Sequence, residues 1–198
     1  EFEKKGIKTD EAVFQVLKKY IKESKPIRFE GNNYSNEWKE EAKKRGLSDL
    51  SDVPLIYDAY LSKNSKDLFI NLGVMTEKEI IARTKVKWET YTKKVQIESR
   101  VLGDLVLNHI IPVAVEYQTK LLENVKKIKE VFGEDEYKVL AAERIKLIKE
   151  IGEHITSIKT KVNAMIEERK KANAIGEVRE KAIAYSKYVF PYLDDIRQ

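Results

Sequence analysis

The sequence predicts an all-α fold, in which short connector helices are followed by an antiparallel bundle of three long helices, the first kinked near Pro112. Two observations predict this fold. Apolar residues recur at steps of three and four along most of the 198-residue chain, which is the spacing of one helix face. Glycines 46, 73, 133 and 176 each stand where such a periodicity stops, as glycines with positive φ do just after helix ends.

Short helices are expected in the first 75 residues. The first spans about residues 9–24 and has an apolar face made of Val13, Val16, Leu17, Tyr20 and Ile21. Residues 27–29 alternate apolar with basic side chains and indicate a very short strand. The remaining short helices have expected starts at Ser35, at Asp52 and at Asn64 or Ser65.

The first long helix is expected to begin at a capping box. In this motif the hydroxyl of Thr76 accepts a hydrogen bond from the backbone N–H of Glu79, and the Glu79 carboxylate reaches back to the N-cap. The apolar seam that follows is Tyr91, Val95, Ser99, Leu102, Val106, Ile110, Val113, Tyr117, Leu121, Val125, Ile128 and Phe132. Pro112 removes one backbone hydrogen bond inside this helix, so a kink is expected near residues 108–112.

Two further helices complete the expected bundle. The second covers about residues 135–173, with a seam of Tyr137, Ala141, Arg144, Ile148, Ile151, Ile155, Ile158, Val162, Met165, Arg169 and Ala172. The third begins after Gly176, with Pro191 as a local irregularity and a seam of Val178, Ala182, Tyr185, Val189, Tyr192 and Ile196. Alternating steps of four and three are typical of long antiparallel or coiled-coil packing. We therefore expect connector helices in residues 1–75 and the bundle in residues 76–198.

Composition excludes several classes of protein. The chain has no cysteine, which excludes a disulfide framework, a thiolate nucleophile, an iron–sulfur cluster and Cys-ligated zinc. The longest apolar stretch, Ile110–Val115, is far shorter than the roughly 20 residues that cross a membrane. The net charge is +5, but acidic residues interleave with the basic runs, so no nucleic-acid partner is expected. The chain begins with Glu1 and stops directly after an apolar-periodic stretch, so we expect a piece of a longer protein.

No residue is predicted to be catalytic, to bind a cofactor or to ligate a metal. A di-iron bundle site needs two Glu-x-x-His motifs, but the glutamates Glu150 and Glu153 precede His154 by four residues and by one. The other histidine, His109, is expected to be hydrogen-bonded beside the bundle seam. The turn at residues 31–33 lacks the Lys and Ser/Thr of a phosphate-binding loop. From the residues alone, the chain is a helical interaction module.

Several separated segments resemble type III glutamine synthetases, in the region that follows the catalytic core. These segments are Arg28–Trp38, Phe69–Val74 with Thr76 and Glu79 behind it, Gln96–Ser99, Leu107–Pro112 and Met165–Ala172. Leu107–Pro112 is similar to the family's long bundle helix, and Met165–Ala172 to its return helix. The resemblance covers essentially the whole chain in order.

The resemblance implies a parent enzyme that joins glutamate and ammonia with ATP and Mg²⁺, in large double-ringed homo-oligomers in the cytoplasm. Its active sites would lie on a β-sheet core that precedes Glu1, so this chain would be inactive alone. Residues 1–75 would be the tail of the catalytic region, and residues 76–198 the family's helical extension. The implied partners are the rest of the polypeptide and neighbouring subunits, with a packing or assembly role.

Two other functions stay open. The heptads of residues 135–173 suit an independent helical scaffold or a coiled-coil oligomerisation module. The basic net charge and long amphipathic helices suit a peripheral membrane binder, but the polar faces carry both signs, whereas surface-binding helices favour Lys and Arg. A membrane is therefore not expected among the partners.

Overall fold

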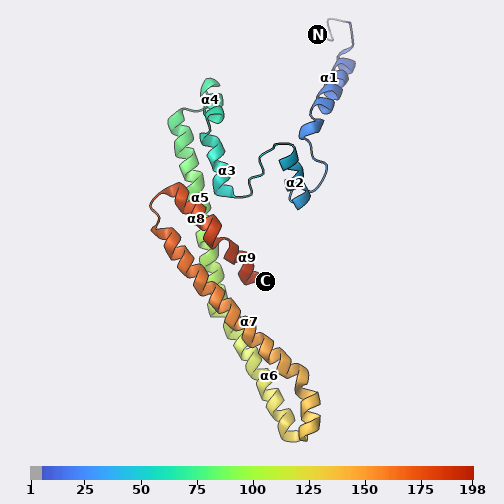
Figure 1. The fold of residues 1–198 in the computed structure, drawn as a ribbon, viewed down its shortest axis with the longest axis vertical. Coiled ribbons are helices and arrows are strands. Elements are labelled where there is room, and N and C mark those ends of the chain that lie inside the picture. The colour runs from blue at the N-terminus through green and yellow to red at the C-terminus, as the bar shows by residue number, and fades with distance from the viewer. Residues whose placement is uncertain (1–5) are drawn as a thin grey trace. The chain divides into compact units, whose positions relative to one another are not determined.

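The computed structural model describes residues 6–198, in which the chain is helical and forms no β-strand, so the all-α prediction is confirmed. The chain separates into two compact units, one ending at Ser51 and one running from Asp52 to Gln198 (Figure 1). The domains expected from the sequence divide after residue 75. That boundary follows regions of a resembled family rather than packing, and it stays a prediction.

The first unit contains α1 (Thr9–Glu23) and α2 (Asn36–Lys44). The strand expected at residues 27–29 is absent, because Lys25–Ile27 forms a 3₁₀ turn, for which Pro26 is suited by its fixed φ. Arg45, at the end of α2, donates to the carbonyl oxygens of Pro26 and Arg28 at 2.8 and 2.7 Å. This side chain fixes the end of α2 on the loop that follows α1.

The apolar face predicted for α1 is present, but the first unit leaves it largely uncovered. Ala12 is the buried residue of this helix. The large side chains Val13, Phe14, Leu17, Tyr20 and Ile21 are 52, 56, 54, 63 and 54% exposed. The helix therefore presents an apolar surface that its own unit does not use.

The second unit begins with short helices that pack on a long one. These are α3 (Val53–Ile56), the 3₁₀ helix η3 (Tyr57–Leu61) and α4 (Lys63–Asn71), which contact α5 (Glu77–Leu105). Helix α4 is capped by Ser62, whose hydroxyl accepts from the Ser65 N–H at 3.3 Å, so the start expected at Asn64 or Ser65 was too late.

The capping box at the start of α5 is confirmed. The Thr76 hydroxyl accepts from the Glu79 N–H at 3.3 Å, and the Glu79 carboxylate accepts from the Thr76 N–H at 2.8 Å. Of the four glycines expected to have positive φ, Gly46 and Gly73 have it. Gly133 instead precedes the next helix as its N-cap with φ −65°, and Gly176 also lacks a positive φ.

The bundle consists of a broken long helix, an unbroken return helix and a broken final helix (Figure 1). The first continues from α5 through a π-turn, η4 (Val106–Ile110), into α6 (Ile111–Val131). Helix α7 (Glu134–Ala174) runs back beside α6 and α5. The last comprises α8 (Val178–Ala184), a second π-turn, η5 (Tyr185–Val189), and α9 (Pro191–Arg197), and it packs on α5 and α7.

Both prolines of the bundle directly follow a π-turn. The Ile111 N–H donates to the Val106 carbonyl, and the Phe190 N–H donates to the Tyr185 carbonyl, so each bond spans five residues instead of four. Pro112 and Pro191 then stand in the first turns of α6 and α9. The irregularity predicted near residues 108–112 is confirmed, and its physical form is a widened helical turn.

The π-turn shifts the apolar seam by one residue, and here the sequence-based seam was wrong. Ile110, Val113 and Tyr117 are 44, 66 and 50% exposed. Their neighbours Ile111, Ala114 and Gln118 are half-buried instead, and the two seams coincide again at Leu121. A regular step of three or four residues does not include the extra residue of a π-turn. The pattern therefore places the residues that follow the π-turn one position out of register. In α7 the prediction failed at Arg144, which is exposed, whereas Ile145 is half-buried.

The core of the second unit lies where α5, α7 and the final helix meet. Helix α7 contributes Val162, Met165 and Ala172. The first long helix contributes Val95, in α5, and Val106, in η4. The final helix contributes Ala184, Tyr185, Val189, Leu193 and Ile196. All ten side chains are at most 7% exposed, so this junction holds the bundle together through apolar burial.

Replacing Pro112 with Ala is expected to leave the π-turn and the shifted seam in place. The packing of Ile111, Ala114 and Gln118 against α7 requires the shift, whether or not residue 112 carries an N–H. We expect unchanged far-UV circular dichroism and a change in the free energy of unfolding of no more than about 1 kcal/mol. A variant crystal structure with a regular α-helix over residues 106–112 would contradict this account.

Candidate functional site

The residues singled out from the sequence do not converge on a reaction centre. His109 and His154 are both exposed, on η4 and α7, so the expectation of a bundle histidine at position 109 is wrong. His109 lies in the π-turn η4, where the apolar seam shifts by one residue. Between residues 6 and 198, no group of three His, Asp or Glu side chains is placed to hold a metal ion. No helix in that range combines the length and apolarity needed to cross a membrane.

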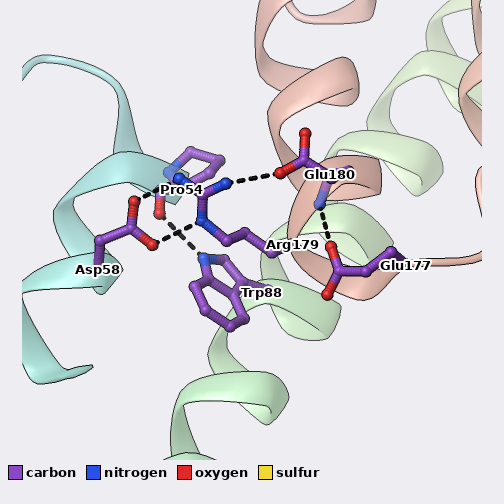
Figure 2. A network of polar contacts seen from close by, with 6 residues as sticks. All are labelled: Pro54, Asp58, Trp88, Glu177, Arg179 and Glu180. Atoms are coloured by element: carbon purple, nitrogen blue, oxygen red, sulfur yellow. Dashed lines mark hydrogen bonds and ion pairs between the residues drawn. The ribbon is translucent and has the colours of Figure 1, made fainter.

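A polar network joins η3 to the start of α8 (Figure 2). The Arg179 guanidinium donates from Nε and Nη2 to the two carboxylate oxygens of Asp58, at 2.7 and 2.6 Å. Its Nη1 donates to Glu180 at 2.6 Å, and the Glu177 carboxylate caps α8 by accepting from the Glu180 N–H at 2.7 Å. The hydrogen bonds to Asp58 raise the pKa of Arg179. This bidentate pair is the favourable geometry for an arginine–carboxylate contact.

Trp88, on α5, holds the segment formed by α3 and η3 against that helix. Its indole N–H donates to the Pro54 carbonyl at 2.9 Å, and the side chain is 4% exposed (Figure 2). The residue before Trp88 is Lys87, whose ammonium lies 5.6 and 5.0 Å from the ring centroids of Tyr57 and Tyr60, within cation–π range. Helices α3 and η3 are therefore held to α5 by directional contacts as well as by apolar burial.

A further hydrogen bond links the start of α3 to the final helix. The Ser186 hydroxyl, in η5, donates to the Asp52 carboxylate at 2.9 Å. Burial raises the pKa of Tyr91 on α5, and a hydrogen bond with Ser186 opposes the rise. Asp52, Tyr91 and Ser186 thus meet at one point from three elements.

A separate polar cluster lies inside the bundle around Tyr185. This side chain is fully buried, and its hydroxyl donates to the Asn173 amide oxygen at 2.7 Å. The Gln96 amide donates to the same oxygen at 3.1 Å. Burial raises the pKa of Tyr185, and the positive charge of Arg169 opposes that rise.

Two hollows follow one another along α5 beside the Tyr185 cluster. The first, of about 340 Å³, is lined by residues that include Thr92, Lys93, Gln96, Asn173 and Lys181. The second, of about 240 Å³, is lined by residues that include Arg100, Asp104, Asn108 and Arg169. In the described part of the chain, Thr92 Oγ1 and Arg169 Nη1 are buried and have no hydrogen-bond partner. The candidate site is thus a polar seam of α5 and α7 with two openings.

Two members of this seam are predictable from the sequence. Ser99 and Arg169 occupy positions of the predicted apolar seams, where they are expected only to pack, and both lie there in the structure. A polar or charged residue at a seam position was the signal that could have been used. Thr92 and Arg100 were not singled out, because only the approach of α7 makes their positions distinctive.

Comparisons with known proteins agree with one another. The family model described as the glutamine synthetase C-terminal domain matches residues 12–129. A protein named glutamine synthetase from Bacteroides fragilis is 50% identical over 192 residues, which are 97% of this chain and 26% of the relative. One of the same name from Butyrivibrio fibrisolvens is 29% identical over 193 residues, covering 98% of this chain and 27% of the relative.

A type-3 glutamine synthetase from Dictyostelium discoideum is 30% identical over 114 residues, or 58% of this chain and 16% of that protein. The chain spans about a quarter of the length of the two bacterial relatives. The similarity to them extends through both compact units, because nearly all of this chain is aligned.

The two tryptophans allow a matched test of the connector anchor. Trp88→Phe removes the indole donor and leaves the buried Pro54 carbonyl unpaired, so we expect the unit from Asp52 to Gln198 to lose about 1–3 kcal/mol of unfolding free energy. Trp38→Phe, in the other unit, is the control and should leave that transition unchanged. Chemical denaturation followed by circular dichroism measures both. Equal effects of the two substitutions would refute the anchoring role of Trp88.

Proposed function

Because this chain belongs to the glutamine synthetase C-terminal domain family, we propose that it is a non-catalytic helical domain of a type III glutamine synthetase, with a role in packing and subunit assembly. The family match confirms the resemblance noted in the sequence motifs. The parent enzyme in this proposal ligates glutamate and ammonia at the expense of ATP, as a cytoplasmic homo-oligomer.

The ATP and Mg²⁺ of the proposed parent would be held outside this chain. Mg²⁺ is bound through carboxylates together with substrate phosphates, in near-octahedral geometry. Among residues 6–198, no group of three His, Asp or Glu side chains is placed to hold a metal ion. We therefore assign no catalytic step to any residue of this chain.

The observation that carries the packing role is the uncovered apolar face of α1. Five large apolar side chains on this one helix are each more than half exposed: Val13, Phe14, Leu17, Tyr20 and Ile21. Contiguous exposed apolar surface marks sites of protein–protein contact. In the proposed enzyme, this face would pack against the rest of the polypeptide or a neighbouring subunit.

An independent oligomerisation module is the second candidate, and the pair of α6 and α7 favours it. Val113, Leu122, Val131 and Val139 are 66, 51, 74 and 78% exposed along these helices. Two helices bury only one face of each other, and four-helix bundles form when two such pairs combine. Light scattering of the isolated chain tests this candidate, because a mass that stays monomeric at every concentration would contradict self-association.

The purified chain is expected to show no ATP-dependent γ-glutamyl transfer, because it has no metal-ligand cluster in its described residues. The assay is run with glutamate, ammonia, ATP and Mg²⁺. A full-length glutamine synthetase serves as the positive control. Turnover above the background of the protein-free mixture would contradict the non-catalytic role.

A charge placed on the α1 face is expected to disturb assembly of the longer protein. Leu17→Glu puts a carboxylate on the apolar face, so we expect lower oligomeric mass by light scattering. The control is Lys22→Glu on the same helix. In the isolated chain, both variants should leave the melting of the unit from Asp52 to Gln198 unchanged, because α1 belongs to the other unit. Indistinguishable masses for the two variants of the longer protein would contradict a packing role for this face.

A further inference from the structure

The second hollow along α5 combines positive charge with an unpaired donor. It measures about 240 Å³ and lies between α5 and α7, at the level of η4. Arg100 and Arg169 line it, together with Asp104 and Asn108. Leu107 and Ile166 also line it and pack against the apolar core, so one wall of the hollow is apolar. We call this hollow the arginine groove.

Arg169 is the central residue of the arginine groove. Its Nη1 is buried and has no hydrogen-bond partner among the described residues. A guanidinium offers five donors in a fixed fork, and burying one of them unpaired is unfavourable. An acceptor that reached this atom would remove that penalty.

The acidic residues nearest to Arg169 in sequence have other partners. Glu167 accepts from Lys170 at 2.7 Å and Glu168 from Lys171 at 2.6 Å. Asp104, on the facing helix, accepts from the Asn108 amide at 2.7 Å. Across residues 6–198, neither Arg100 nor Arg169 takes part in an ion pair within 4.0 Å. Both guanidinium charges are therefore available to a ligand.

Both arginines of the groove also affect the buried phenol of Tyr185. Burial raises the pKa of its phenol, and the positive charges of Arg169 and Arg100 each oppose that rise. The Tyr185 hydroxyl itself is committed to Asn173. Both arginines thus act electrostatically on the same buried phenol.

We propose that the arginine groove binds a small oxyanion, a carboxylate or a phosphate group, through the guanidinium groups of Arg169 and Arg100. Guanidinium groups match the two oxygens of such anions in a bidentate fork, which lysine cannot reproduce. Asp104 opposes the ligand, because its carboxylate has the same sign. This site is separate from the packing role of α1, so either conclusion can fail without the other.

The test is a titration of the full 198-residue chain with inorganic phosphate and, in a second arm, with acetate, against chloride at matched ionic strength. Binding is measured by calorimetry and by the rise in melting temperature, since a ligand of the folded state stabilises it. A phosphate response alone identifies a phosphate group, and a response to both anions identifies a general oxyanion site. No response to either anion would overturn the proposal.

The variants separate the groove from general surface charge. Arg169→Lys keeps the charge but loses the fork, and it should weaken binding by about tenfold. Arg100→Gln changes an exposed residue and should weaken binding with little effect on folding. Asp104→Asn removes the opposing charge and should tighten binding. The control is Lys170→Gln, one residue along α7, where the ammonium is exposed and paired with Glu167.

Circular dichroism of each variant without ligand establishes that the helices are intact. If Arg169→Lys does not fold, Arg100→Gln and Lys170→Gln still decide the matter, because they remove the same charge and only Arg100 lines the groove. Equal affinities in the Arg100→Gln and Lys170→Gln variants, which lose the same charge, would show that the anion binds by charge alone, and would overturn the proposal.

Discussion

The seam of α7 is the constraint on which the rest of the larger unit depends. This 41-residue helix packs against α5 and α6 and against the final helix, and both of those partners are interrupted by a π-turn just before a proline. After the first π-turn, Gln118 lies toward α7, and its amide donates to the Ile148 carbonyl at 2.8 Å. Gly152 makes room for it, since a Cβ at that position would lie 3.3 Å from the Gln118 amide nitrogen. The extra residue of the π-turn thus keeps α5 and α6 aligned with the uninterrupted helix α7.

Helices α3 and η3 are fixed to this framework by contacts between distant parts of the sequence. Trp88 meets Pro54 across 34 positions, and Arg179 meets Asp58 across 121. Both contacts involve the segment that begins the larger unit, and one holds it to α5 while the other holds it to α8. Closure of such long loops is entropically costly, so these contacts become favourable once the bundle itself has formed.

Packing of the bundle alone does not require the polar side chains that lie in the seam. The cluster of Tyr185, Asn173 and Gln96 satisfies its own hydrogen bonds, whereas Arg169 keeps one buried donor unpaired. The two proposed roles, packing on a neighbouring chain and binding of an anion, would therefore use different parts of the molecule. The first would use the apolar face of α1, and the second would use charged groups between α5 and α7.

The sequence by itself determined the helical class, the positions of the long helices and the family. Helix periodicity and the Thr76 capping box are local properties, which neighbouring residues specify without reference to the fold. Only the tertiary structure decided the register between residues 106 and 121, because a π-turn inserts a residue that a regular period cannot reveal. It also decided that α1 stays uncovered in its unit and that Arg100 and Arg169 line one hollow. Burial and side-chain convergence depend on which helices pack together, and that is a property of the whole fold.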